Sequence, residues 1–268
     1  MRPHPTTTSL PPHQFDRLVQ KAAQRDATSQ ADNPFRRPPT IPIETAILIT
    51  VLATRHNLVQ AVLAAIFATS QPTISRVLAW GRRAIPDLLE PAMVTLDDVP
   101  TTEQVLADGA LVVTGNRAGH DHLYSGKRHQ SGVGIQVLAD RWGRLLDVVG
   151  PVPGATHDAR AWFDLGLHER LADRIVLADL GYLGCSDPST GCMVRTPVRK
   201  PRGKKLSRVQ RVSNYAHNSA RAAVERAIAQ LKKWRVLGTG YRGPLSRIKD
   251  VIRTAVALEK LRTHPWPL

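Results

Sequence analysis

Apolar and polar residues recur along the chain with two different periods, and the change from one to the other divides the sequence. From Ile43 the apolar positions follow helical spacing, which predicts three helices over residues 43–56, 58–67 and 71–84. Asn57 and Ser70 stand at expected N-caps, and Pro72 falls in a first turn, where its missing N–H costs no hydrogen bond. The pattern indicates a helical domain over residues 43–95.

The segment before Ile43 is rich in proline and threonine and has only a weak helical pattern over residues 15–24. Its prolines cluster at its end, at Pro34, Pro38, Pro39 and Pro42. Such punctuation is typical of a linker. We therefore expect residues 1–42 to be a lead-in with a short helix.

Beyond residue 100 the apolar residues form short, nearly continuous runs. They predict strands over residues 105–114, 132–140, 144–152, 174–182 and 193–198. Helical spacing returns over residues 157–167 and 218–234. Nearly continuous apolar strands are typical of a sheet that helices cover on its faces. We expect an α/β domain over residues 100–245, followed by a C-terminal helix over residues 246–268.

The second and third predicted helices are joined by a tight turn, and polar residues cluster at the start of the third. This arrangement is typical of a helix-turn-helix, whose second helix enters the major groove of DNA. Gln71, Thr73 and Arg76 would then face DNA, and Arg82 and Arg83 could reach phosphates. An ordinary three-helix bundle has the same pattern, so both interpretations stay open.

Charge is distributed unevenly. The formal net charge is +15, and residues 195–268 carry 19 Lys or Arg against 3 Asp or Glu. Between Arg195 and Arg235 there are 13 basic residues and a single acid, Glu225. Such a field indicates a protein that grips a phosphate backbone, although a basic tail can also adhere to nucleic acid without specificity.

Other classes of protein are disfavoured. No apolar run approaches the roughly 20 residues of a membrane span, and the first residues lack the apolar region of a signal peptide, so we expect a cytoplasmic protein with no membrane partner. Cys185 and Cys192 lack the spacing of a zinc site or a disulfide framework, so we expect two ordinary thiols.

Three acids are candidates for chemistry. Asp108 and Asp179 each lie near the carboxyl end of a predicted strand, where α/β sheets form their ligand crevice, and each is closely followed by a glycine. Most Asp-Gly pairs are turns, so neither aspartate is convincing alone. If both converge with Glu225, the three carboxylates suit two Mg²⁺ (or Mn²⁺) ions in a two-metal site for displacement at phosphorus.

Glu225 lies on the predicted helix over residues 218–234. At ~100° per residue, Asn218, Arg221, Glu225 and Lys232 share one edge of that helix, beside an apolar stripe. The alternative is that Glu225 only pairs with Arg221 one turn away.

Five segments in order carry a resemblance: LADGA, YSGKRH, PGATHDAR, ADLGY and NSARAAVERAIAQLKKWRVL. Together they resemble the core of bacterial insertion-sequence transposases of the DDE type, in the branch akin to eukaryotic Harbinger transposases. The resemblance runs from about residue 43 to residue 244 and includes the predicted helix-turn-helix.

This resemblance implies an RNase H-like fold, a mixed sheet flanked by helices, with Asp108, Asp179 and Glu225 as catalytic, metal-binding residues. Asp158, beside His157 in PGATHDAR, is the rival second acid, and we expect it to cap a helix or order the site. The chain departs from the family at Ala110, where Thr is usual, and at Leu180, where Lys is common. Asn replaces the family's Tyr at residue 218, as in this branch.

The resemblance also implies a transposase that binds terminal inverted repeats, cleaves DNA and transfers strands to target DNA, as a homo-oligomer on double-stranded DNA. Phosphate contacts are then expected from Arg221 and Lys232, from the loop over residues 199–211, and from YSGKRH; they include Lys127, Arg128, Lys204 and Lys205. A catalytically silent DNA-binding protein and a simple metal-dependent nuclease are the alternatives. Intact acids argue against the silent protein.

Overall fold

The computed structural model describes residues 4–32 and 41–264, so Pro34, Pro38 and Pro39 of the predicted linker lie outside the described residues. Contacts divide the chain into two compact units. The helical unit consists of Met1–Met93 and Leu231–Leu268, and the sheet unit is Val94–Gln230. Residues 231–245, which the sequence grouped with the sheet, thus belong with the helices.

The helical unit is built around one buried helix. Its elements are α1 (Pro5–Thr8), α2 (Pro12–Asp32), α3 (Ile43–His56), α4 (Gln60–Ile66), α5 (Gln71–Leu89), η1 (Glu90–Ala92), α9 (Arg235–Gly238), η5 (Leu245–Arg247) and α10 (Ile248–Thr263). Every residue from Ala46 to Thr54 of α3 is buried, because α2, α5, α9 and α10 all pack against it. Trp234, just before α9, is buried too, and its indole N–H donates to Glu259 of α10. Helices from the N-terminal and C-terminal parts of the sequence therefore pack together into one unit.

The predicted helices exist, but their boundaries differ in two places. Asn57 does not cap α4: it has left-handed backbone angles (φ 53°, ψ 42°) at the end of α3, and its amide donates to Gly240 O. Asparagine tolerates that conformation, which explains why it ends a helix here. Helix α4 starts at Gln60. The predicted start of α5 is confirmed, since the Ser70 hydroxyl accepts from Thr73 N and proline stands in the first turn, but the helix continues beyond the predicted end at Ala84 to Leu89.

The weak helical pattern over residues 15–24 underestimates α2, which extends over Pro12–Asp32. Phe15 and Leu18 of α2 are fully buried in the helical unit. Among the described residues, no single helix is long and apolar enough to cross a membrane. The stretches Gln60–Ile66 and Gln71–Asp98 meet the criteria of length and composition only as a pair, which is bent by 105° at the break between them.

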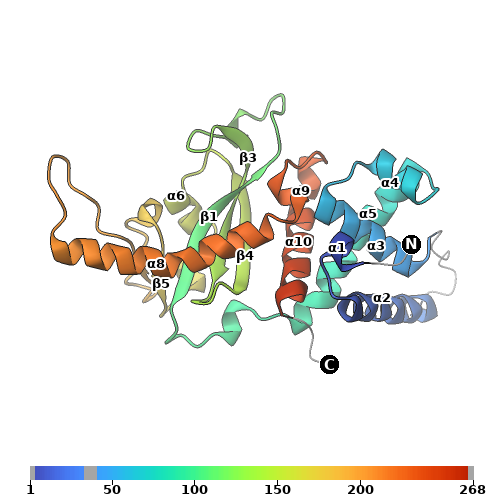
Figure 1. Cartoon of the computed structure of the whole chain (residues 1–268), viewed down its shortest axis with the longest axis horizontal. Coiled ribbons are helices and arrows are strands. Elements are labelled where there is room, and N and C mark those ends of the chain that lie inside the picture. Colours follow the sequence, from blue (N-terminus) through green and yellow to red (C-terminus); the bar gives the residue numbers. More distant parts are fainter. Residues whose placement is uncertain (1–3, 33–40, 265–268) are drawn as a thin grey trace. The chain divides into compact units, whose positions relative to one another are not determined.

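The sheet unit contains a mixed six-stranded sheet flanked by helices (Figure 1). Its strands are β1 (Val105–Val113), β2 (Tyr124–Ser125), β3 (Gln130–Ala139), β4 (Leu145–Pro153), β5 (Ile175–Leu177) and β6 (Met193–Arg195). Strand β3 pairs antiparallel with β1 on one side and with β4 and β2 on the other, whereas β1, β5 and β6 pair in parallel. The predicted α/β class is confirmed at this level.

All five predicted strands are present, but β5 is much shorter than the 174–182 pattern. It ends at Leu177, and the chain then turns into the short helix η4 (Leu180–Tyr182). Asp179 therefore lies in a connection just after the strand.

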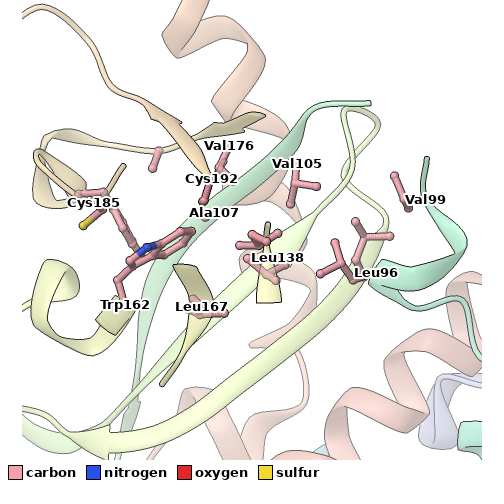
Figure 2. Close-up of a cluster of buried hydrophobic side chains, with 14 residues drawn as sticks. Leu96, Val99, Val105, Ala107, Leu138, Trp162, Leu167, Val176, Cys185 and Cys192 are labelled. Atoms are coloured by element: carbon pink, nitrogen blue, oxygen red, sulfur yellow. The ribbon is translucent and has the colours of Figure 1, made fainter. Parts of the chain in front are cut away.

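Helices α6 (Asp158–Asp164) and α7 (Leu167–Arg170) pack on the sheet through an apolar cluster. Figure 2 shows Trp162 of α6 toward one side of the cluster, near Ala107 of β1 and Cys185. Trp162 is fully buried, and so is Leu138 of β3. This cluster packs α6 against β1 and β3 of the sheet.

Helix α8 (Arg208–Leu231) starts ten residues before the predicted helix. Figure 1 shows it in orange, lying along the sheet at one end and extending beyond it at the other, where it follows a long loop. Ala223 and Val224 are buried, whereas Val209, Val212 and Tyr215 are exposed. The C-terminal half of α8 therefore packs in the unit, and the N-terminal half projects.

Candidate active site

Asp108 lies where β1 loses its parallel neighbour. Strand β5 pairs with β1 only at Val105 and Leu106. We expected Asp108 near the end of its strand, but it lies within β1, which continues to Val113. Beyond Leu106, two side chains hydrogen-bond to the backbone of β1. Asp108 Oδ1 accepts from Gly109 N at 2.8 Å, and the Arg128 guanidinium donates to Gly109 O at 3.1 Å.

Asp179 is held at the same edge by two local interactions. Its Oδ1 accepts from Gly181 N at 2.8 Å, so the carboxylate caps η4. The ring of His217 on α8 lies 2.9 Å from Ala178 O, which ties that helix to the chain immediately before Asp179. Nothing in the sequence had marked His217 as a residue that positions the second acid.

Asp158 is the fourth acid at this place, and we call Asp108, Asp158, Asp179 and Glu225 the acid cluster. Asp158 does not act as the expected helix cap. His157 occupies the N-cap position of α6 and Asp158 is the first helical residue. The Asp158 carboxylate instead pairs with Lys127, with 3.1 Å between Oδ2 and Nζ, and the same ammonium lies 4.0 Å from Asp179 Oδ2. A β-carbon at Gly109 would lie 2.2 Å from Asp158 Oδ1. Glycine at 109 therefore leaves the space that Asp158 occupies.

Arg221 joins the third acid to the first. Its Nη2 lies 3.4 Å from Asp108 Oδ2 and 3.8 Å from Glu225 Oε1. The suspected pair of Arg221 with Glu225 one turn away therefore exists, but the same guanidinium also pairs with Asp108 across the fold. Arg221 is only 8% exposed, and its guanidinium lies against these acids. Its role in positioning phosphates stays a prediction. The Glu225 side chain remains largely exposed.

Burial and the closeness of several aspartates shift the pKa values of Asp108 and Tyr182. Burial raises the pKa of Asp108; Arg221 opposes this effect, and the negative charges of Asp179 and Asp158 add to it. The same three aspartates, together with burial, raise the pKa of Tyr182 well above its ordinary value. Tyr182 thus stays protonated and donates to the Gln136 side-chain oxygen. An excess of negative charge at one place favours the binding of a cation.

The cluster has the chemistry of a site for a hard divalent cation, since such ions take carboxylate oxygens as ligands. Within the described residues, however, no three or more Asp, Glu, His or Cys side chains are arranged as a metal site. Instead of a metal ion, the side chains of Lys127 and Arg221 lie beside the carboxylates and neutralise their charge. The carboxylate oxygens are therefore suitable ligands for a divalent cation, although basic side chains pair with them in this structure.

The remaining predicted site residues of the sheet unit lie on its surface. His157 and Asn218 are exposed, and so are Lys204 and Lys205 in the loop that precedes α8. The loop predicted over residues 199–211 is shorter, because α8 already starts at Arg208.

In the helical unit, Lys232 follows the end of α8 and is partly buried. Gln71 and Arg76 are exposed on α5 as predicted. Thr73 is not available to DNA: it is 8% exposed, and its hydroxyl lies 2.9 Å from that of Ser70. The prediction that Thr73 faces outward was wrong, because its side chain is buried against the N-cap residue Ser70.

Residues 107–260 match a protein family described as DDE superfamily endonuclease. The chain is 29% identical over 236 residues to a putative transposase for insertion sequence element IS112 from Streptomyces albus G, covering 86% of this chain and 83% of that protein. It is also 29% identical over 121 residues to a probable transposase for insertion sequence element IS702 from Microchaete diplosiphon, covering 45% and 42%. The matched family segment contains all four acids of the cluster.

Proposed function

Because this chain belongs to the DDE superfamily of endonucleases, we propose that it is a transposase that binds the terminal inverted repeats of its insertion sequence and catalyses metal-dependent DNA cleavage and strand transfer. The observation that carries the proposal is the shared Arg221 guanidinium, which lies within 4 Å of both Asp108 and Glu225. Two acids that are far apart in the sequence thus meet at one place, and Asp179 contributes to the field there.

Asp108, Asp179 and Glu225 are the residues that would hold the divalent cations, for which we propose two Mg²⁺ or Mn²⁺ ions. Ions bound there would supply activation of the attacking oxygen and stabilisation of the leaving oxygen of an in-line displacement at phosphorus. Asp158 holds Lys127 beside the site. Lys127, beside Asp158 and Asp179, and Arg128, which donates to Gly109 O, are proposed to hold a substrate phosphate next to the acids.

The projecting loop and helix start, residues 196–215, form what we call the basic arm. It contains Arg199, Lys200, Arg202, Lys204, Lys205, Arg208 and Arg211, and no acid. Its last residue, Tyr215, has an exposed aromatic side chain. A cationic arm without acids suits the backbone of the DNA flanking the cut or of the target duplex.

In the helical unit, α4 and α5 are proposed as the helix-turn-helix that recognises the terminal repeats. Exposed Gln71 and Arg76 at the start of α5 would read base edges, as the recognition helices of such motifs do. For the sheet unit we propose the RNase H-like fold, and for the branch the Harbinger-like one. A transposase that holds both ends of an element works as an oligomer on DNA, in the cytoplasm of a bacterium.

The test uses labelled duplexes that end in the repeats flanking the gene, incubated with Mg²⁺. Wild type is expected to nick the DNA at the repeat ends and to join the freed ends to target DNA. Asp179→Asn should bind the same DNA with unchanged affinity but lose nicking and joining together. Asp164→Asn, at an exposed aspartate of α6 outside the cluster, is the matched control and should retain both activities.

A second candidate function is a catalytically silent DNA-binding protein. It is favoured by one observation, that the described acids are neutralised by Lys127 and Arg221 and are not arranged as a metal site. Binding of the repeat ends without nicking in Mg²⁺ or Mn²⁺ would establish this alternative. Nicking without end specificity or joining would instead indicate a simple nuclease.

A further inference from the structure

Helix α4 has an apolar side that is exposed to solvent. Its inner side consists of Leu63 and Ala64, which are buried where the helix packs against α3 and α5. The opposite side is also apolar, although it is exposed. We call this side, with the N-cap residue that precedes the helix, the α4 face; its residues are Val59, Ala61, Val62, Ala65 and Ile66. Single exposed apolar residues are common on proteins, whereas a contiguous apolar patch marks a contact surface.

The chain around the α4 face carries no charge. Residues 57–75 contain no Asp, Glu, Lys, Arg or His, in a chain whose formal net charge is +15. The first helix of a helix-turn-helix crosses the DNA backbone, where polar and basic side chains donate to phosphates. No side chain of the α4 face has such a donor. The face is therefore suited to a protein surface and not to phosphates.

The absence of charge favours a second copy of this chain as the partner. Across a two-fold axis the same patch of both copies meets, so a charged patch near the axis would face its own charge. Most of this basic chain is unsuited to such a contact. The α4 face meets the condition because it is neutral.

The shape of the α4 face is also self-complementary. Val62 and Ile66 lie one turn apart and form a ridge, which Val59 extends toward the start of the helix. Ala61 and Ala65 form a row of small side chains beside that ridge. Helices pack by placing the ridge of one into the groove of the other. A two-fold axis does this twice, once in each direction.

We propose that two copies of this chain associate through their α4 faces, helix against helix, around a two-fold axis. This inference deepens the oligomer of the proposed function by naming its contact surface, and it rests on that function only for the role of the dimer on DNA. Stable interfaces bury about 800 Å² per partner, and a helix of two turns offers little area. The dimer in solution is accordingly weak and reversible.

Salt should strengthen this dimer. Both copies carry a large positive charge, and exposed arginines stand near both ends of the face: Arg242 donates to Asn57 O just before α4, and Arg76 lies on α5 beyond the turn that follows it. Salt screens their repulsion and leaves apolar burial intact. Contacts between basic and acidic groups would weaken with salt instead, so the sign identifies the kind of interface.

The test is sedimentation equilibrium of the full-length chain without DNA, over a range of protein concentrations and from low to high salt. We expect a monomer–dimer equilibrium whose dissociation constant falls severalfold as salt rises. Ala65→Lys places a charge within the face, and we expect it to weaken the dimer about tenfold or more, because like charges then meet. Ala118→Lys, at an exposed alanine of the sheet unit, is the matched control and should dimerise as wild type does.

A second variant separates a specific contact from apolar adhesion. Ala65→Leu adds apolar surface but fills the row of small side chains, so we expect it to weaken the dimer as well. Tighter association of Ala65→Leu would indicate adhesion without a defined geometry and would overturn the inference.

Cysteine cross-linking locates the contact without disturbing it. Ala65→Cys, oxidised by oxygen with a copper–phenanthroline catalyst, should give disulfide-linked dimers, whereas Ala118→Cys should not. Cys185 and Cys192 are buried and give the common background.

The inference is overturned if wild type stays monomeric over the whole range of concentration and salt. It is also overturned if the dimer persists in Ala65→Lys, or if Ala65→Cys gives no more cross-linked dimer than Ala118→Cys. Binding of the terminal repeats is measured separately by fluorescence anisotropy. A chain that dimerises through the α4 face but does not bind the repeats contradicts the proposed function and leaves this inference standing.

Discussion

Lys127 and Asp158 form an ion pair of 3.1 Å between Nζ and Oδ2, although 31 residues separate them. The ammonium also lies 4.0 Å from Asp179. A positive side chain therefore stands beside two of the four acids, where a divalent cation would have to compete with it.

Replacing Lys127 by methionine removes this competition and keeps the length of the side chain. Because the ammonium is largely exposed, the gain is modest, and we expect Lys127→Met to bind Mn²⁺ about two- to fivefold more tightly without DNA. Titration of free Mn²⁺ by electron paramagnetic resonance measures it. Lys249→Met, on exposed surface of α10, should match wild type. Weaker binding by Lys127→Met would show that Lys127 supports the metal-binding geometry.

Gly109 provides a steric test of the role of Asp158. A methyl group there would lie 2.2 Å from Asp158 Oδ1, so Gly109→Ala must push that carboxylate away from Lys127. We expect the variant to remain folded but to lose most of its cleavage activity. Gly126→Ala, where the added carbon meets open space, is the matched control. Full activity in Gly109→Ala would remove Asp158 from the site.

The raised pKa of Asp108 makes stability depend on pH. Burial is its main cause. The stability contributed by this group is fully present below the pKa it has in the unfolded chain, and it is lost as the pH rises through the higher pKa of the folded protein. In EDTA, Asp108→Asn should therefore be more stable than wild type at neutral pH, with the difference shrinking in acid. Urea unfolding at several pH values tests this, and a difference independent of pH would contradict it.

The basic arm should determine the salt dependence of DNA binding. Each phosphate contact contributes about −0.9 to the slope of log K against log salt concentration. If Lys204 and Lys205 each contact a phosphate, the double change to glutamine should make that slope shallower by about 1.8 units. Anisotropy between low and moderate salt measures this, with Lys249→Gln as the control. An unchanged slope would place the DNA away from these lysines.

Two tryptophans of the sheet unit should differ sharply in their effect on stability. Trp162 is fully buried between α6 and the sheet (Figure 2). Its replacement by alanine should lower the free energy of unfolding by about 3–5 kcal/mol. Trp142 is 54% exposed and stacks with Arg141 and Arg144. Trp142→Ala should change stability by less than about 1 kcal/mol. Urea unfolding of both variants gives the comparison.

The sequence predicts the elements of the fold better than their ends. The runs that became β1, β3 and β4 are nearly continuous and apolar, and the structure confirms them. The run over residues 174–182 is equally apolar, but its second half turns away, because Asp179 uses its side chain to cap η4. Local hydrogen bonding of one aspartate shortened the strand, and hydrophobic periodicity carries no sign of it.

The acids of the site were easier to predict than the cations beside them. Asp108 and Glu225 each lie within 4 Å of Arg221, but the convergence of Asp108, Asp179 and Glu225 on metal ions stays a prediction, because no three such side chains among the described residues are arranged as a metal site. Lys127 and Arg221 were predicted to contact DNA phosphates, because the basic side chains of a strongly basic protein are expected to bind phosphate. Their pairing with acids follows from contacts across the fold between β1, α6 and α8. Such contacts have no local signature in the sequence.

The helical unit contains both ends of the chain, and the sheet unit is the stretch between them. During synthesis, a ribosome that has released residue 230 has made every strand of the sheet unit, but α3 and α5 still lack α10, which packs against both. A nascent chain can therefore complete its acid cluster before its helical unit is closed. Premature termination after that point would leave a chain with every strand of the sheet unit and a helical unit that lacks α9 and α10.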